Sequence, residues 1–208
     1  MQLNENGTPT LSYQRVHDST IGSFYQNLSA CDKRLIQLMD EYSHQALAKR
    51  FSKRKNRPAE FLQLEITADY QQQVIRPYID KRLTTVLELI KEEYGWIYLN
   101  SKSGNPTSSL LTVSAHLATV RFHFINQEEG TKYYPTIQHQ ELGPVKPARD
   151  EAHLITIKPC WLMVKGHLFQ FTDNLDGKKL KPFLSRGSLQ IPKRSEPEFY
   201  RKFIPQII

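Results

Sequence analysis

The chain has 208 residues, of which 28 are Lys or Arg and 21 are Asp or Glu, giving a formal net charge of +7. Hydrophobic residues make up 39% of the chain and aromatic residues 11%, which excludes wholesale disorder and provides bulky side chains for a core. The absence of a long apolar run excludes an ordinary transmembrane helix, and the polar first ten residues do not resemble a signal peptide. Only two cysteines are present, Cys31 and Cys160, which predicts reduced thiols in a cytoplasmic protein.

The first part of the chain carries strand and helix patterns. Alternating residues predict a short strand over 9–16. Ser29, with Asp32 three positions later, is typical of a capping box and predicts one helix over about residues 30–50. Residues 59–66 fit a helix start or a strand.

A second helix is predicted more strongly. Apolar residues recur every three or four positions over residues 71–94, which indicates an amphipathic helix. Pro77 favours regular helix from that point, and Gly95 stands where a helix-ending glycine belongs.

After Gly95 the pattern predicts five to eight short antiparallel strands, which form either one curved sheet or two packed units. Loops are expected over 100–109 and 142–150, a hairpin turn at Lys165-Gly166, and a helix over 196–208. Strands are expected at 96–99, 111–113, 119–125, 133–139, 154–157, 161–164, 167–171 and 189–191.

Positive charge is concentrated in two places. Residues 49–57 carry six basic and no acidic side chains, and residues 146–208 carry twelve basic and six acidic ones. Clustered cations favour an anionic partner, of which nucleic acid is the leading example, although a solvated surface explains them equally well. The residues predicted to contact phosphate are Lys49, Arg50, Lys53, Arg54, Lys55, Arg57, Lys178, Lys179 and Lys181.

Motifs of catalysis are missing from the sequence. Gly177-Lys178-Lys179 lacks the earlier glycine and the hydroxyl of a phosphate-binding loop. The tetrad Asp150-Glu151-Ala152-His153 matches a helicase magnesium motif, but no phosphate loop accompanies it, so it is interpreted as a loop end before a strand. No catalytic residue and no cofactor are therefore expected.

Metal and thiol chemistry are not indicated either. The seven histidines and two cysteines have no metal-ligand spacing, so no metal site is expected. Cys160 lies between Pro159 and Trp161 in apolar surroundings, which favours a buried, inert thiol. Arg121 and His123 alternate on one strand face, which indicates a partly exposed sheet surface rather than a site.

Several runs of residues resemble one family. Together they are similar to the N-terminal region of Bacteroidetes-type bacterial Swi/Snf-family (DEAD/DEAH-like) helicase ATPases, and the likeness spans most of residues 33–208. The runs that carry it are Phe51 to Phe61, Tyr133 to His139, Lys158 to Phe171, Asp176 to Leu184, Ile191-Pro192-Lys193 and Phe199 to Ile208.

This resemblance implies an ATPase motor well downstream, with its own phosphate loop and acidic box, so the motor's catalytic residues have no counterpart here. The tetrad at 150–153 is then not the acidic box of the motor. The last helix ends on an apolar face at Ile208, which the resemblance explains as a boundary inside a longer protein.

We therefore expect an α+β fold, with a mostly helical part over 1–94 and an antiparallel β-rich part over 95–208. The leading interpretation is a non-catalytic accessory domain of a Swi/Snf-like DNA-dependent ATPase that helps to engage duplex DNA or regulates the motor. One alternative is a protein-interaction module that docks on the motor without touching nucleic acid. Another is a free-standing enzyme of a class that the sequence does not reveal.

Overall fold

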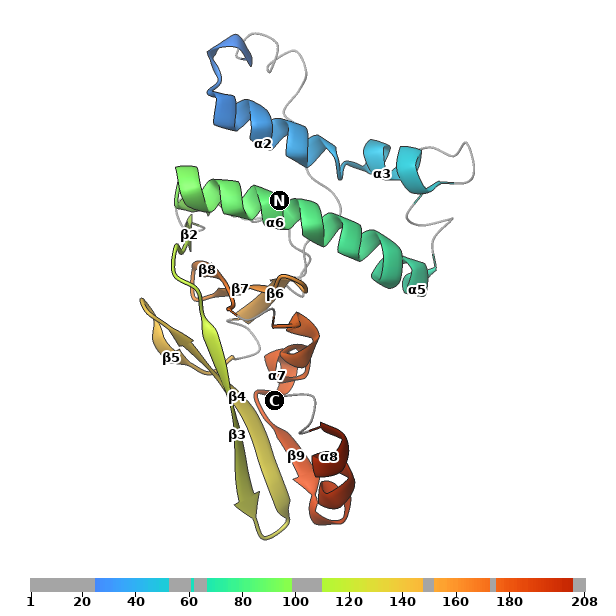
Figure 1. Cartoon of the computed structure of the whole chain (residues 1–208), viewed down its shortest axis with the longest axis vertical. Coiled ribbons are helices and arrows are strands. Elements are labelled where there is room, and N and C mark those ends of the chain that lie inside the picture. Colours follow the sequence, from blue (N-terminus) through green and yellow to red (C-terminus); the bar gives the residue numbers. More distant parts are fainter. Residues whose placement is uncertain are drawn as a thin grey trace.

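The computed structural model describes residues 25–52, 61, 67–98, 110–147, 152–172 and 175–203. The described chain has an α+β fold, with helices first and two β-sheets after them (Figure 1). The strand expected over 9–16 and the loop expected over 100–109 lie outside the described residues, as do residues 59–66 apart from Phe61.

The capping box at the start of the first helix is confirmed. A short 3₁₀ turn, η1 (Tyr25–Asn27), precedes α2 (Ala30–Asp40). The backbone N–H of Asp32 donates to Ser29 Oγ over 3.0 Å, and the Ser29 N–H donates to the Asp32 carboxylate over 3.1 Å. Two N–H groups that would otherwise lack partners at the helix start are thus satisfied.

The prediction of one helix over 30–50 is wrong in its middle. The chain forms α2 and a separate α3 (His44–Phe51). Ser43 between them has an extended backbone, with ψ at 156°, and its Oγ accepts the N–H of Ala46 over 3.1 Å. Because this side chain caps a new helix, the apolar pattern continues while the helix axis does not.

The second predicted helix is confirmed and begins slightly earlier. Thr67 caps α5 (Ala68–Tyr70), which runs through a π-helical turn, η2 (Gln71–Ile75), into α6 (Arg76–Glu93). Pro77 lies at the start of α6, directly after the π-helical turn, and contributes no N–H to the helix there. Gly95 ends the helix with φ at +71°, and its N–H donates to the carbonyl of Ile90 over 2.8 Å.

Nine strands form two sheets in the described part of the chain. In the five-stranded sheet the order is β1-β2-β8-β7-β6, and in the four-stranded sheet β4 pairs with β3 along one edge and with β5 and β9 along the other. The strands are β1 (Trp96–Tyr98), β2 (Leu110–Val113), β3 (Thr119–Gln127), β4 (Gly130–His139), β5 (Gly143–Val145), β6 (Ala152–Thr156), β7 (Trp161–Val164), β8 (His167–Gln170) and β9 (Leu189–Pro192).

The two sheets test three predictions for the part of the chain after Gly95. The hairpin turn between β7 and β8 is confirmed, with φ at +48° for Lys165 and +79° for Gly166. The loop expected over 142–150 instead contains β5, which pairs with the end of β4. Of the tetrad at 150–153, Ala152 and His153 begin β6, and the other two residues lie outside the described part.

The sheets are rich in antiparallel pairings, as predicted, and one pairing of the described strands is parallel. β2 and β8 are parallel, with Thr112 opposite His167 and Val113 opposite Leu168. Ala118 continues this pairing at the other end of β8 and exchanges hydrogen bonds with the backbones of Gln170 and Thr172. The chain thus passes from one sheet into the other while it remains attached to β8.

The five-stranded sheet is covered on both faces. Leu83 and Leu87 of α6 pack on one face, against Trp161, Met163 and Leu168. The other face packs against Leu180 beside the short helix α7 (Lys181–Arg186), and against Ile137 and Val145 of the second sheet. Its residues on that face include Leu162, Val164 and Phe169.

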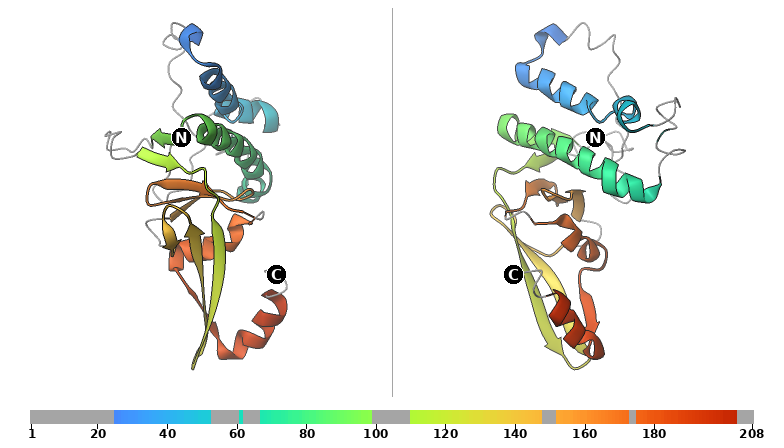
Figure 2. Two further views of the ribbon diagram at one scale, coloured as in Figure 1. Left: turned by 60° about the vertical axis from the view of Figure 1, so that its left-hand side comes forward. Right: turned by 45° about the vertical axis from the view of Figure 1, so that its right-hand side comes forward.

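The four-stranded sheet has one covered face. Its Tyr133 and Ile191 pack on Phe183 of α7 and on Phe199 of α8 (Glu196–Phe203), which follows the 3₁₀ turn η5 (Lys193–Ser195). The views in Figure 2 show α8 beside the far end of the long β3–β4 hairpin.

Candidate nucleic-acid interface

The basic residues predicted from the sequence lie on two separate elements. Lys49 and Arg50 form the last turn of α3. Lys178 and Lys179 are in the 3₁₀ turn η4 (Gly177–Lys179), and Lys181 begins α7. The remaining predicted contacts, Lys53, Arg54, Lys55 and Arg57, lie outside the described residues.

These two elements are not brought together. Leu47 and Ala48 of α3 pack against Ile79 of α6. Helix α6 covers one face of the five-stranded sheet, whereas α7 packs on the other (Figure 1). The described cations of α3 and α7 therefore do not form one surface.

Arg50 already has aromatic partners inside the fold. Its guanidinium lies 4.8 Å from the centre of the Tyr78 ring and 5.8 Å from that of Phe51. Cation–π contacts of this kind hold the end of α3 against α6. The guanidinium of Arg50 would have to leave these rings before it could turn freely toward a phosphate.

The turn before α7 presents its cations on a fixed backbone. The Asp176 carboxylate accepts the N–H of Lys178 over 2.8 Å, and Leu180 is fully buried. Lys178 and Lys181 are exposed, and Lys179 is half-buried. This segment is able to offer two solvent-facing cations to an anionic partner.

A third group of cations lies on the uncovered face of the four-stranded sheet, which we call the outer sheet face. Because side chains alternate along a strand, the residues next to buried Tyr133 and Ile137 point away from α7 and α8. None of the described side chains on this face is acidic. The described residues of the outer sheet face are Thr119, Arg121, His123, Ile125 and Gln127 of β3, Lys132, Tyr134, Thr136 and Gln138 of β4, Pro144 and Lys146 at β5, and Gln190 of β9.

Strand pairing arranges the outer sheet face in rows. Arg121 of β3 stands opposite Thr136 of β4. Lys146, the residue directly after β5, lies along the other edge of β4 and continues this row. Two rows further along, Ile125 stands opposite Lys132. The two rows are four positions apart along β4, so cations occur at positions about 13 Å apart along the strand.

An aromatic row lies between the cationic rows. The His123 and Tyr134 rings are stacked, with centroids 4.9 Å apart and planes 16° apart. The Lys146 ammonium lies 5.1 Å from the centre of the Tyr134 ring. These neighbours occupy the flat surfaces of the tyrosine and leave little of them for another aromatic ring.

Part of this surface could be predicted from sequence. The alternation of Arg121 and His123 on an exposed face is confirmed, since Arg121 is exposed and His123 half-buried. Lys132 and Lys146 were missed, because only the pairing of β3, β4 and β5 brings them next to Arg121. The sequence patterns contain no signal for these two lysines, because Lys132 precedes the strand predicted over 133–139 and Lys146 lies in the loop predicted over 142–150.

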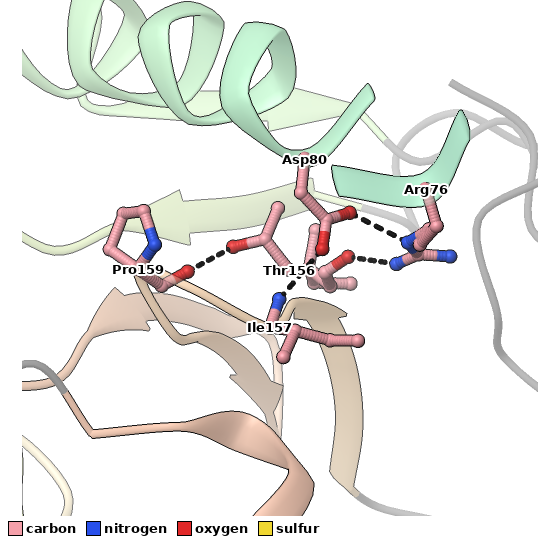
Figure 3. A network of polar contacts seen from close by, with 6 residues as sticks. Arg76, Asp80, Thr156, Ile157 and Pro159 are labelled. Atoms are coloured by element: carbon pink, nitrogen blue, oxygen red, sulfur yellow. Dashed lines mark hydrogen bonds and ion pairs between the residues drawn. The ribbon is translucent and has the colours of Figure 1, made fainter. Parts of the chain in front are cut away.

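The polar network in Figure 3 has a structural explanation. Asp80 of α6 is 3% exposed, and its carboxylate lies 2.6 Å from Arg76 Nε and accepts the N–H of Ile157 over 2.9 Å. Arg76 also donates to the carbonyl of Ile155 over 2.6 Å. Burial raises the pKa of Asp80, and Arg76 opposes that rise. The network ties α6 to the β6–β7 turn.

That same turn contains the buried cysteine. Thr156 Oγ1 donates to the carbonyl of Pro159 over 2.6 Å, and a cis peptide bond joins Lys158 to Pro159 (Figure 3). Cys160 is 1% exposed, and burial raises the pKa of its thiol to about 12. The predicted inert thiol is therefore supported, because the reactive thiolate is strongly disfavoured.

Two searches of the described residues bear on other classes of site. Within the described ranges, no three or more His, Cys, Asp or Glu residues are grouped so as to hold a metal ion. Among the described helices, none has both the length and the apolar character needed to cross a membrane.

Comparison of the chain with protein-family models, with curated proteins and with solved structures gives no match.

Proposed function

We propose that the chain is a non-catalytic accessory domain of a Swi/Snf-like DNA-dependent ATPase, and that it contacts duplex DNA through the phosphate backbone. The observation that supports this best is the outer sheet face, where Arg121, Lys132 and Lys146 occur with no acidic residue at the described strand positions, although Glu128 and Glu129 occupy the turn at the end of the β3–β4 hairpin. Such a surface attracts a polyanion and displaces its condensed counterions. The Swi/Snf association comes from the sequence resemblance.

The aromatic row favours phosphate over unpaired bases as the ligand. Proteins that bind single strands offer free aromatic faces on which bases stack. On the outer sheet face, His123 and Lys146 lie against the Tyr134 ring, as described above. The cations remain available, and they bind a backbone without reading its sequence.

The spacing of the cationic rows also suits a duplex. Rows about 13 Å apart match the scale of the B-DNA grooves, which are about 6 and 12 Å wide between the two backbones. Phosphates of both strands would then meet the face at once. The domain would bind no cofactor, catalyse no reaction and act in the cytoplasm.

The test is fluorescence anisotropy of a labelled duplex at low and physiological salt. For the triple variant Arg121→Glu, Lys132→Glu, Lys146→Glu, we expect affinity to fall at least about tenfold. With three phosphate contacts, the slope of log K against log salt should be about −2.7 in the unmodified chain and close to zero in the variant.

The matched control is Lys81→Glu, Lys158→Glu, Arg186→Glu, which changes the net charge equally at three exposed positions outside every predicted contact. It should retain most of the affinity. Equal losses in both variants would reduce the effect to net charge, and no binding by the unmodified chain at low salt would overturn the proposal. The variant Lys53→Glu, Arg54→Glu, Lys55→Glu tests the remaining basic run directly.

One observation favours the alternative of a protein-interaction module. Trp96 of β1 and Leu110 of the neighbouring β2 are each 48% exposed and lie at the same edge of the five-stranded sheet. The variant Trp96→Ser, Leu110→Ser should weaken binding to a purified Swi/Snf-type ATPase motor if this edge is the docking surface. Unchanged affinity would remove this candidate.

A further inference from the structure

A buried histidine lies at the junction of the two sheets. His139 ends β4 of the four-stranded sheet, and its ring stacks on Phe169 of β8 in the five-stranded sheet, with centroids 4.5 Å apart. The residue is 4% exposed. Both of its ring nitrogens are buried and neither makes a hydrogen bond to a described residue.

Most buried imidazoles have a partner for at least one nitrogen, because an unsatisfied polar atom is costly. The neutral ring of His139 is tolerated in this position, since it is flat and packs on an aromatic face. A protonated ring would place a full charge against Phe169 in a buried site, a cost that Glu141 and the backbone of His116 offset only in part. The packing at the junction therefore selects the neutral form.

The charged and titratable groups around His139 come from three elements. His167 of β8 lies with its ring centre 6.5 Å away, and its Nδ1 is 3.3 Å from the carboxylate of Glu141 in the β4–β5 turn. Ser114, at the end of β2, donates to the other oxygen of Glu141 over 3.1 Å and accepts the N–H of His116. Burial is the largest cause and lowers the pKa of His139; Glu141 and the backbone of His116 oppose this, while the charges of His167 and His116 add to it.

We propose that His139 is an acid-operated latch which holds the four-stranded sheet, and with it the outer sheet face, against the five-stranded sheet. The neutral ring keeps the two sheets packed together at the junction, which is the closed state. Uptake of a proton by the ring separates the sheets there and gives the open state. This inference does not depend on which ligand the outer sheet face binds. The latch is specific to the junction, because Asp80 and Arg76 fix α6 to the opposite face of the five-stranded sheet.

The sign of the effect follows from the lowered pKa. A histidine in an open, solvated junction has a pKa of about 6.5, so below that pH the open state binds more protons than the closed state. Closure is complete above pH 6.5 and weakens as the pH falls toward the lowered pKa of the closed state. Within that window the ratio of closed to open molecules should fall by up to about tenfold per pH unit.

The experiment is amide hydrogen exchange of the full chain between pH 7 and pH 5, corrected for the intrinsic rate. We expect protection to fall at Ile137 and Val145 by up to about tenfold per pH unit while amides of α6 keep theirs. In His139→Phe, which retains an aromatic ring against Phe169 and cannot take up a proton, this fall should disappear. His153→Gln, on β6 away from the junction, should behave as the unmodified chain does.

Two results would overturn the latch. One is an equal fall of protection in the unmodified chain and in His139→Phe; the other is simultaneous exchange of α6, which would indicate global unfolding. If His139→Phe does not fold, the ring titration of His139 in the unmodified chain decides by NMR. A midpoint below 6.5 supports the proposal and a midpoint at or above 6.5 contradicts it.

Discussion

The two sheets differ in how much of each is covered, and this difference separates scaffold from candidate surface. All four residues of β7 in the five-stranded sheet are buried, because α6 lies on one face and α7 with the second sheet on the other. None of the nine residues of β3 in the four-stranded sheet is buried. A sheet packed on both faces offers a partner little beyond its edge at β1 and β2, whereas the four-stranded sheet offers a whole face.

The largest effect is expected where the scaffold buries charge. Asp80→Ala would leave Arg76 without its carboxylate and the N–H of Ile157 without an acceptor, so the free energy of unfolding should fall by about 3–5 kcal/mol. Chemical denaturation measures this. The conservative variant Asp80→Asn keeps the side-chain size and should lose less, and an unfolding energy unchanged by Asp80→Ala would contradict the structural interpretation of the network.

A pair of apolar truncations compares the two sheets directly. Leu162→Ala in β7 removes a fully buried side chain and should cost about 2–5 kcal/mol. Ile125→Ala in β3 removes a side chain that is 44% exposed and should change stability by less than about 0.5 kcal/mol. Similar costs for the two variants would mean that the outer sheet face is covered in solution, and the comparison would fail.

A smaller and more local effect is expected at the tip of the β3–β4 hairpin. Gly130 has φ at +138°, and a Cβ added there would lie 2.0 Å from the carbonyl oxygen of Ile191. Gly130→Ala should therefore separate β9 from β4 and loosen α8, at a cost of about 1–3 kcal/mol. Hydrogen exchange should rise in β9 and α8 and stay unchanged in β7, whereas loss of protection throughout would make the hairpin part of the scaffold.

The smallest effect is expected for an exposed ion pair on α8, the helix that packs beside this hairpin. Glu198 and Lys202 of α8 lie 2.6 Å apart, and their side chains are 65% and 66% exposed. Glu198→Gln should change the free energy of unfolding by less than about 0.5 kcal/mol, because water already screens the pair. A loss above about 1 kcal/mol would indicate that α8 is anchored by charge instead of by Phe199 and its aromatic neighbours.

Local rules predicted the elements that local contacts determine. The capping box at Ser29, the glycine at the end of α6 and the turn at Lys165-Gly166 each depend on a few neighbouring residues, and the sequence contains all of them. The gap between α2 and α3 was missed, because the apolar spacing continues across Ser43 while its side chain starts a new helix.

The candidate surface depends on contacts that no local pattern contains. Arg121, Lys132 and Lys146 lie on three different stretches of chain, and they share a face only because β4 pairs with β3 and β5. The predicted contacts at Lys49 and Lys178 came from charge density along the chain, and the structure places them on opposite sides of the five-stranded sheet. Charge density along a sequence is a poor guide to charge density on a sheet, where residues from separate strands are neighbours.

The parallel pairing of β2 with β8 has a consequence for synthesis on the ribosome. The two strands are joined by residues 114–166, so β2 stays without this neighbour until β8 has left the exit tunnel. Meanwhile β3, β4 and β5 contact one another over short sequence distances and are free to pair first. The five-stranded sheet is thus expected to be completed after β3, β4 and β5 have paired. Nascent chains arrested before β8 should contain the β3–β4 hairpin and lack the complete five-stranded sheet.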